Sequence, residues 1–142
     1  RRGSNFVTTK IVDGAIKIKL GLQEKLELGN LDSYRDWGYS GDYVKAMHMI
    51  VNHDKPDDFV VATGQTHSVR EWCDLVFSKL GLDYKDYVVQ NEKFLRPQEL
   101  DYLRGDSTKI KETLGWEPEH SFDWLLTEMV KQRMEVIQNK LK

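Results

Sequence analysis

The feature that most constrains the fold is an apolar run followed at once by a helix signal. Residues 58–64 read "DFVVATG", a short and continuous run with β-branched residues, which is typical of a strand buried on both faces. In the next segment, "HSVREWCDLVFSKLG", Ser68 and Glu71 form a capping box and Gly81 marks the helix end. The two signals predict a buried strand of a parallel sheet, followed by a helix.

Helix and strand patterns alternate along the rest of the chain. An apolar stripe at helical spacing predicts an amphipathic helix that begins near Ser4 or Asn5. "EKLELGN" and "YVVQ" predict short strands. Because strands alternate with helices, the pattern favours an α/β or α+β architecture. The stripe of the first helix consists of Val7, Ile11, Ala15, Ile18 and Leu22.

Three further segments predict helices. "GDYVKAMHMIVNH" forms one with a single apolar side, and "DSTKIKETLG" forms a short one capped by Asp106 or Ser107. "SFDWLLTEMVKQRMEVIQNKLK" predicts a long helix with basic residues at its end. The apolar side of the first of these three helices consists of Tyr43, Ala46, Met47, Ile50 and Val51.

Charge and cysteine content narrow the class of protein. The 142 residues hold 21 Lys and Arg against 23 Asp and Glu, so no nucleic-acid partner is expected. The single cysteine, Cys73, favours reducing surroundings and a cytoplasmic protein. No apolar run approaches the roughly 20 residues that span a bilayer, so no membrane partner is expected. The chain opens on "RRGSNF" without methionine, and we expect it to be an excerpt from a longer protein.

The usual catalytic and metal-binding patterns do not occur. There is no G-x-G-x-x-G after a strand and no P-loop, so a complete dinucleotide or nucleotide-triphosphate fold is not predicted. The four histidines lack the spacing of a zinc site, and no metal is expected. Ser68 and Ser121 are better explained as helix caps than as nucleophiles.

Two arginines have aromatic or apolar neighbours in the sequence. Arg35 and Asp36 lie between Tyr34 and Trp37, while Arg96 is fixed between Leu95 and Pro97. Such surroundings suit an anionic group held beside a flat apolar surface. The alternative is an internal arginine–carboxylate pair at each position. The tryptophans in "RDWG" and "LGWEP" are interpreted as packing anchors.

Longer motifs carry a family resemblance over nearly the whole chain. "RRGSNFVTTKI", "LGNLDSYRDWGYSGDYVKAM", "DDFVVATGQTHSVREW", "RPQELDYLRGDSTKIKETLGWEP" and "SFDWLLTEMV" occur in this order. With these motifs the chain resembles the C-terminal portion of the GDP-mannose 4,6-dehydratase family. Thr9 stands where that family usually carries an arginine.

The resemblance implies a fold and a reaction. The expected fold is α/β, the C-terminal part of an NAD(P)-binding Rossmann-type extended short-chain dehydrogenase, with the substrate-binding region and late elements of the parallel sheet. Residues 1–142 would form one nucleotide-sugar-binding portion, and the NADP-binding and catalytic part would precede them. The complete enzyme would convert GDP-mannose to GDP-4-keto-6-deoxymannose, with hydride leaving C4 of the sugar for NADP and returning to C6. No catalytic residue is assigned here, and this portion alone is expected to be inactive.

The resemblance also implies ligand contacts and partners. GDP-mannose is the expected substrate, and a homodimer or homotetramer is the expected assembly. The alternatives are a GDP-4-keto-6-deoxymannose reductase or another nucleotide-sugar epimerase or dehydratase, and a nucleotide-binding module without catalysis. The implied contacts are Arg2 with the NADP phosphate, Lys10 and Arg35 with phosphate or nucleotide, Val7 with guanine, Arg96 with the diphosphate, and Glu99 with a ribose or base donor.

Overall fold

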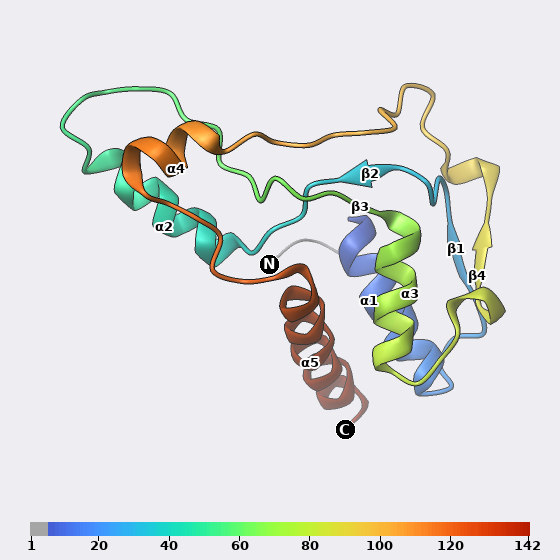
Figure 1. Ribbon diagram of the computed structural model, residues 1–142. Coiled ribbons are helices and arrows are strands. Elements are labelled where there is room, and N and C mark those ends of the chain that lie inside the picture. The colour runs from blue at the N-terminus through green and yellow to red at the C-terminus, as the bar shows by residue number, and fades with distance from the viewer. Residues whose placement is uncertain (1–5) are drawn as a thin grey trace.

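The computed structural model of the chain describes residues 6–142 (Figure 1). The helices and strands that the sequence predicts are found, except for the strand at residues 58–64. The predicted start of the first helix, near Ser4 or Asn5, lies outside the described residues. The helices are α1 (Val7–Lys19), α2 (Ser40–Val51), α3 (Val69–Lys79), α4 (Thr108–Leu114) and α5 (Phe122–Leu141), with single 3₁₀ turns at Tyr84–Asp86 and Glu92–Phe94. The strands are β1 (Leu26–Leu28), β2 (Tyr34–Arg35), β3 (His67–Ser68) and β4 (Val88–Gln90).

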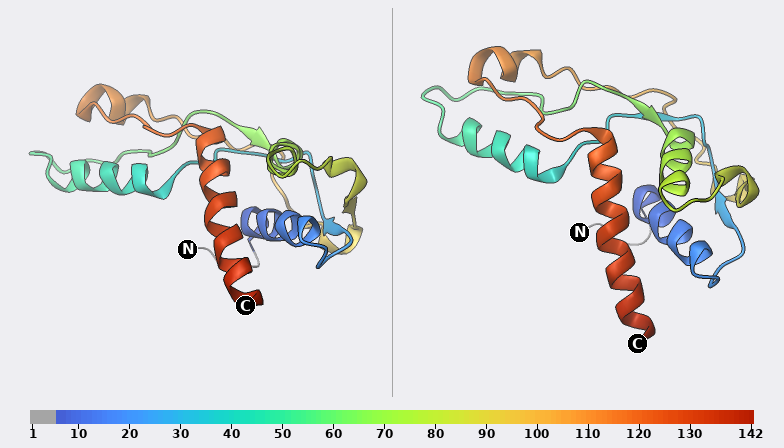
Figure 2. Two further views of the ribbon diagram at one scale, coloured as in Figure 1. Left: turned by 90° about the horizontal axis from the view of Figure 1, so that it is seen from below. Right: turned by 60° about the horizontal axis from the view of Figure 1, so that its bottom comes forward.

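The main hydrophobic core lies where α1, α3 and α5 pack together. Figure 2 shows α5 beside α1, with α3 on the same side of the molecule. The middle of the predicted apolar stripe, Ile11, Ala15 and Ile18, is buried here, because these residues recur about once per helical turn. Its two ends are not buried: Val7 is 39% exposed, and Leu22, which lies beyond the end of α1, is 52% exposed. α3 contributes Trp72 and Phe77, which are 1% and 0% exposed. Trp37 packs edge-on against Trp72 with ring centres 4.8 Å apart, which confirms it as a packing anchor.

Two small sheets border this core. β1 and β4, two strands that the sequence predicts, pair in parallel, with Leu26 opposite Val88. The parallel sheet expected from the run at 58–64 is thus formed by other segments. β2 and β3 pair antiparallel, with Tyr34 opposite Ser68. The sequence does not predict β2 or β3, because two residues are too few to show an alternating pattern.

The strand predicted at residues 58–64 is wrong. This segment is extended but forms no ladder, and in Figure 1 it is the green coil that leads from α2 past α4 to β3. Val60 is 55% exposed rather than buried. The amides of Thr63 and Gly64 donate instead to the carboxylate of Asp36. An apolar run indicates that burial is favourable, but a strand also needs a neighbouring strand, and none of the described strands lies beside this run.

A second, smaller cluster holds α2 and α4 together. It is built on Ala46, Ile110 and Trp116, which are 0%, 0% and 4% exposed, and the anchoring role predicted for Trp116 is confirmed. The predicted apolar side of α2 is buried only in part, since Met47 is 60% exposed and Val51 is 82% exposed. α2 therefore has more apolar surface than its described neighbours cover.

The predicted helix caps are largely confirmed. Ser68 Oγ accepts a hydrogen bond from the amide of Glu71, and Ser121 Oγ accepts one from the amide of Trp124. Ser107 precedes α4 without a side-chain cap bond, while Asp106 Oδ1 accepts from the amide of Thr108 at 3.0 Å. Among residues 6–142, no helix is both long enough and apolar enough to cross a membrane.

Candidate functional site

An ion pair joins two of the predicted site residues. Arg35 Nη2 lies 3.5 Å from Glu99 Oε1, and Arg35 Nη1 donates to the carbonyl oxygen of Tyr34 at 2.7 Å. The side chains of Arg35 and Glu99 are 23% and 24% exposed. A guanidinium carries several N–H donors in a fixed plane, so Arg35 keeps donors for an anionic ligand beside this long contact.

Backbone hydrogen bonds hold the two partners side by side. The amide of Tyr34 donates to the carbonyl oxygen of Asp101 at 2.7 Å, and the amide of Leu103 donates to the carbonyl oxygen of Tyr34 at 3.0 Å. Tyr34 and Tyr102 thereby form a parallel bridge. Because Glu99 lies just before this bridge, its position relative to β2 is set by the main chain.

Arg96 differs from Arg35 in its surroundings. It is exposed, and it makes no ion pair or hydrogen bond with any described residue. Its neighbours Phe94, Leu95 and Leu100 are 42%, 50% and 62% exposed. Of the two arginines, Arg35 forms the internal arginine–carboxylate pair that was the alternative to ligand binding, and Arg96 forms no such pair with a described residue. A free cation among exposed apolar side chains suits an amphiphilic anion.

The first turn of α1 approaches the same loop. Lys10 Nζ lies 4.0 Å above the ring centre of Phe94, a cation–π contact. Val7, one turn earlier, is 39% exposed. No contact among residues 6–142 joins Lys10 directly to the Arg35–Glu99 pair, so Arg35 and Glu99 are the only predicted site residues that the structure pairs within this range. The contact with Phe94 is not predicted from the sequence.

Two predictions concern the start of the chain. Arg2 lies outside the described residues. Thr9 is 6% exposed within α1, so its side chain faces the interior of the molecule. An arginine at this position could be accommodated only if its long stem carried the charge to the surface or to a partner.

Polar contacts also tune a tyrosine at the bridge. The hydroxyl of Thr66 donates to Tyr102 Oη at 3.4 Å, and together with the nearby Arg104 guanidinium it holds the pKa of Tyr102 below its usual value. The rings of Tyr34 and Tyr102 lie 5.9 Å apart. The bridge therefore presents flat aromatic surface next to Arg35.

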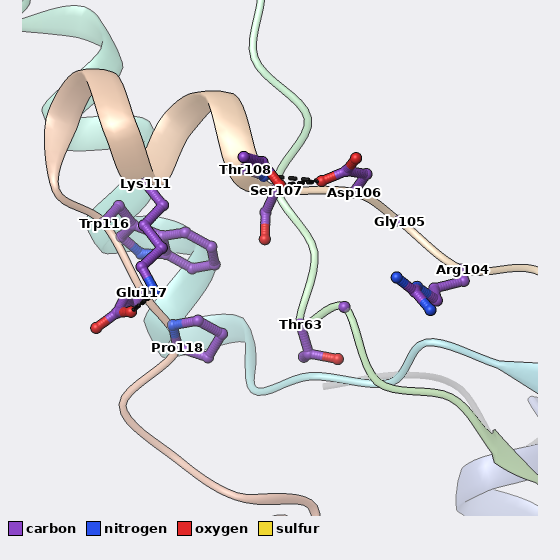
Figure 3. Close-up of a pocket in the computed structure, with 11 residues that line it drawn as sticks. Thr63, Arg104, Gly105, Asp106, Ser107, Thr108, Lys111, Trp116, Glu117 and Pro118 are labelled. Atoms are coloured by element: carbon purple, nitrogen blue, oxygen red, sulfur yellow. Dashed lines mark hydrogen bonds and ion pairs between the residues drawn. The ribbon is translucent and has the colours of Figure 1, made fainter.

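A cavity of about 240 Å³ lies between the end of the run at 58–64, the segment that leads into α4, and the turn after α4 (Figure 3). Its walls come from Thr63, from residues 104–108 and from the turn after α4. The cations at its wall are Arg104 and Lys111, and Lys111 is paired with Glu117 at 2.5 Å. None of the predicted site residues that the structure describes lines this cavity, so it is separate from the Arg35–Glu99 pair.

A buried carboxylate, Asp42, fastens α2 to the turn before α5. Its Oδ2 accepts from the amides of Glu119 and His120, each at 3.1 Å, and His120 Nδ1 lies 2.7 Å from its Oδ1. These three side chains are the one group among residues 6–142 whose ligand atoms lie close enough to hold a metal ion. Glu119, however, is paired with Lys45 at 2.5 Å, and Asp42 is already satisfied by donors. The arrangement therefore has a structural role: it connects α2 to the turn before α5.

Sequence reasoning does not single out Asp36 or Asp42, although both organise the region. Asp42 and His120 are far apart in the sequence, so their spacing gives no metal or pairing signal. Asp36 lies directly after Arg35 in "RDWG", and the sequence gives no sign of the distant backbone amides that it binds. The glycines that meet Asp36, Gly64 and Gly105, were the available signal, because close backbone approach often requires glycine.

Known proteins similar to this chain share one description. A family profile described as GDP-mannose 4,6 dehydratase matches residues 1–129. GDP-mannose 4,6 dehydratase 2 of Arabidopsis thaliana is 51% identical over 136 residues, which cover 96% of this chain and 36% of that protein. GDP-mannose 4,6 dehydratase of Homo sapiens is 43% identical over 154 residues, covering 96% of this chain and 41% of that protein. The chain thus spans only about two fifths of the length of these relatives.

Solved structures with low sequence identity share the fold. RMD from Pseudomonas aeruginosa, complexed with NADPH, matches with a TM-score of 0.85 and 23% identity over 95% of this chain and 44% of that chain. dTDP-glucose 4,6-dehydratase from Bacillus anthracis, in complex with NAD, matches with a TM-score of 0.78 and 19% identity over 94% of this chain and 40% of that chain.

Proposed function

Because this chain belongs to the GDP-mannose 4,6-dehydratase family, we propose that it is the C-terminal, nucleotide-sugar-binding portion of an enzyme that converts GDP-mannose to GDP-4-keto-6-deoxymannose. The observation that carries the proposal is the family match over residues 1–129, together with 51% identity to the Arabidopsis relative across 96% of the chain. The fold is α/β, that of the C-terminal part of an extended short-chain dehydrogenase.

The geometry supports a division of ligand contacts. Arg35 and Arg96 would hold the diphosphate, one from β2 and the other from the exposed loop, with Lys10 adding a third cation from α1. Glu99 is an ionised carboxylate that can only accept hydrogen bonds, so it would receive those of a ribose hydroxyl or a base N–H. Val7 would pack against guanine. The Arg35–Glu99 contact supports this assignment, since it places a donor for phosphate next to an acceptor for sugar or base.

The proposed cofactor is NADP, which supplies hydride transfer when bound. The described residues do not form a site for it on their own: residues 6–142 contain no glycine-rich turn between a strand and a helix that could cradle a pyrophosphate. Arg2, proposed to meet the NADP phosphate, precedes them. Cofactor binding and the catalytic groups therefore belong, in this proposal, to chain that the relatives carry before the matched part.

Exposed apolar surface supports that arrangement. Val60 in the unpaired run and Met47 and Val51 on α2 are 55%, 60% and 82% exposed. We infer that the preceding part of the enzyme covers this surface and gives the run at 58–64 its missing neighbour strand. A homodimer or homotetramer in the cytoplasm is the proposed state of the complete enzyme.

The test is turnover by the complete protein. With GDP-mannose and NADP supplied, the expected product is the 4-keto-6-deoxy sugar without net oxidation or reduction of the cofactor, and the 142-residue chain alone should give none. GDP should compete better than UDP or dTDP, because the three share the diphosphate and differ in the base. If the complete protein instead consumes NADPH and GDP-4-keto-6-deoxymannose, it is a reductase. If it binds GDP without turning over either sugar, it is a binding module.

A further inference from the structure

The carboxylate of Asp36 gathers donors from two distant segments. Its Oδ1 accepts from the amide of Thr63 at 3.0 Å and from Thr63 Oγ1 at 2.5 Å. Its Oδ2 accepts from the amide of Gly64 at 2.9 Å and from the amide of Gly105 at 3.2 Å. One side chain thereby joins the end of β2, the extended run at 58–64 and the segment that leads into α4.

The crossing leaves almost no room for adjustment. A Cβ added to Gly105 would lie 2.1 Å from the Cβ of Ala62, and one added to Gly38 would lie 2.1 Å from the hydroxyl of Tyr43. Gly64 has φ +76°, a conformation that favours glycine. The backbones of these segments lie in direct contact, with little side chain between them. If the hydrogen bonds of the carboxylate were lost, we expect the segments themselves to move, because side-chain rearrangement could not compensate.

Arg35 lies between this junction and a second anchor. On its N-terminal side, Tyr34 is bonded to residues 101 and 103 of the loop. On its C-terminal side, Asp36 is bonded to Gly105 of the same stretch of chain. The loop segment that carries Arg96 and Glu99 therefore ends in a hydrogen bond to the residue next to Arg35.

We propose that Asp36 is a positioning residue that, together with the backbone bonds of Tyr34, sets the distance between Arg35 and the segment carrying Arg96 and Glu99, and so determines the affinity for the nucleoside diphosphate. The proposal rests on the proposed function, since it takes these residues as the diphosphate contacts. Asp36 itself does not touch the ligand: its carboxylate is occupied by backbone and hydroxyl donors, and a second negative charge beside a diphosphate would repel it.

Asp36→Asn tests the proposal in the complete protein. The Asn oxygen can keep the bonds from Thr63, but its NH₂ group would face the amides of Gly64 and Gly105, where it cannot accept. The dissociation constant for GDP, measured by calorimetry, should rise about tenfold or more. The KM for GDP-mannose should rise in parallel while kcat stays within about twofold, because the ligand's charge contacts weaken and the reacting groups are untouched. Asp32→Asn, an exposed acid paired with Arg70, is the matched control and should leave both constants unchanged.

A steric pair tests the junction without changing its charge. Gly105→Ala should weaken GDP binding because the new Cβ meets the Cβ of Ala62. Adding Ala62→Gly removes that contact, leaves the next nearest atoms at 3.7 Å, and should restore binding. Rescue by the double variant shows that the distance between the segments matters, and it keeps the proposal testable if Asp36→Asn does not fold.

A double-mutant cycle separates positioning from general destabilisation. If Asp36 acts through Arg35, Asp36→Asn should add little to the loss already caused by Arg35→Ala. The proposal is overturned if wild-type protein binds GDP and Asp36→Asn binds it equally, if the losses of the two variants simply add, or if Ala62→Gly fails to rescue Gly105→Ala. A complete protein that binds no GDP at all would instead contradict the proposed function.

Discussion

The molecule contains two regions that are held together in different ways. Around α1, α3 and α5, packing is continuous, with large side chains such as Trp72, Phe77 and Ile16 almost wholly buried. Around α2 and α4, the buried apolar cluster is small, and two carboxylates, Asp36 and Asp42, bind the segments through backbone amides. Figures 1 and 2 show this second region projecting on the far side of α5.

The difference indicates which region needs additional protein to bury its apolar surface. Hydrophobic burial is the main stabilising contribution in a domain, and the first region obtains it from its own residues. The second region is fixed in shape by hydrogen bonds but keeps exposed apolar residues, which include Val44 and Met47, each 60% exposed. We therefore expect the first region to be stable within this chain and the second to depend on the rest of the complete protein.

The largest expected effect lies in the first core. Phe77→Ala should lower the free energy of unfolding of the 142-residue chain by about 3–5 kcal/mol, because it removes a fully buried ring and leaves a cavity. Ile110→Ala, in the small cluster, should cost the same chain only about 2 kcal/mol, at the lower end for a buried isoleucine, because a small cluster can collapse around the lost side chain. Urea unfolding followed by circular dichroism measures both. Equal losses would contradict the division into two regions.

A charge on α2 should distinguish the chain from the complete protein. Met47→Glu should leave the stability of the 142-residue chain within about 0.5 kcal/mol, because the side chain is exposed there. In the complete protein it should cost about 2 kcal/mol or more, since we expect the added part to bury this position. Leu22→Glu, at an exposed apolar residue next to α1, is the control and should cost little in both. If Met47→Glu is equally harmless in both proteins, nothing covers this face of α2.

Thiol labelling compares how often the two regions open. Burial raises the pKa of the Cys73 thiol to about 12, so Cys73 should be almost unreactive near pH 8. A thiol introduced by Ala46→Cys, in a Cys73→Ala background, occupies an equally buried site of the second region. It should label at least about tenfold faster in the 142-residue chain, since local opening is easier where the apolar core is small. The reverse order would contradict the comparison.

The thiol of Cys73 gives a pH effect of known sign. The folded pKa of Cys73 is raised above its ordinary value of 9.0, so the unfolded chain loses this proton first as the pH rises. The stability of the folded chain should therefore decline between about pH 9 and pH 12 relative to the Cys73→Ala variant. Unfolding curves of the two proteins at several pH values check this. A difference that stays constant over this range would show that Cys73 is not buried in the folded state.

Local patterns predicted most of the helices but not the polar junctions. The stripe of α1 and the Ser68 cap of α3 depend on neighbouring residues only, so periodicity and capping rules were sufficient. The run at 58–64 was misassigned because strand pairing depends on a partner elsewhere in the chain or beyond it. Asp36 and Asp42 were missed for a related reason, since their donors lie 27 to 78 residues away.

The candidate site shows the same limit. The family resemblance named Arg35 and Glu99, and the structure places them 3.5 Å apart, although 64 residues separate them. The contact of Lys10 with Phe94 could not be read from either segment alone. Arg96 was predicted as a ligand contact, and this stays a prediction, because its exposure is compatible with the role without testing it.

The central claim, that Arg35 and Arg96 bind the diphosphate of a GDP sugar, is tested most directly by calorimetric titration of GDP into the complete protein. Arg35→Ala and Arg96→Ala should each weaken binding by about 1.5–3 kcal/mol, while Arg70→Ala, which removes a surface pair with Asp32, should bind like wild type. The circular dichroism spectra of all three variants should match that of the wild type. If either Arg35→Ala or Arg96→Ala binds GDP normally, or loses binding only by unfolding, that arginine has a structural role and the claim is wrong.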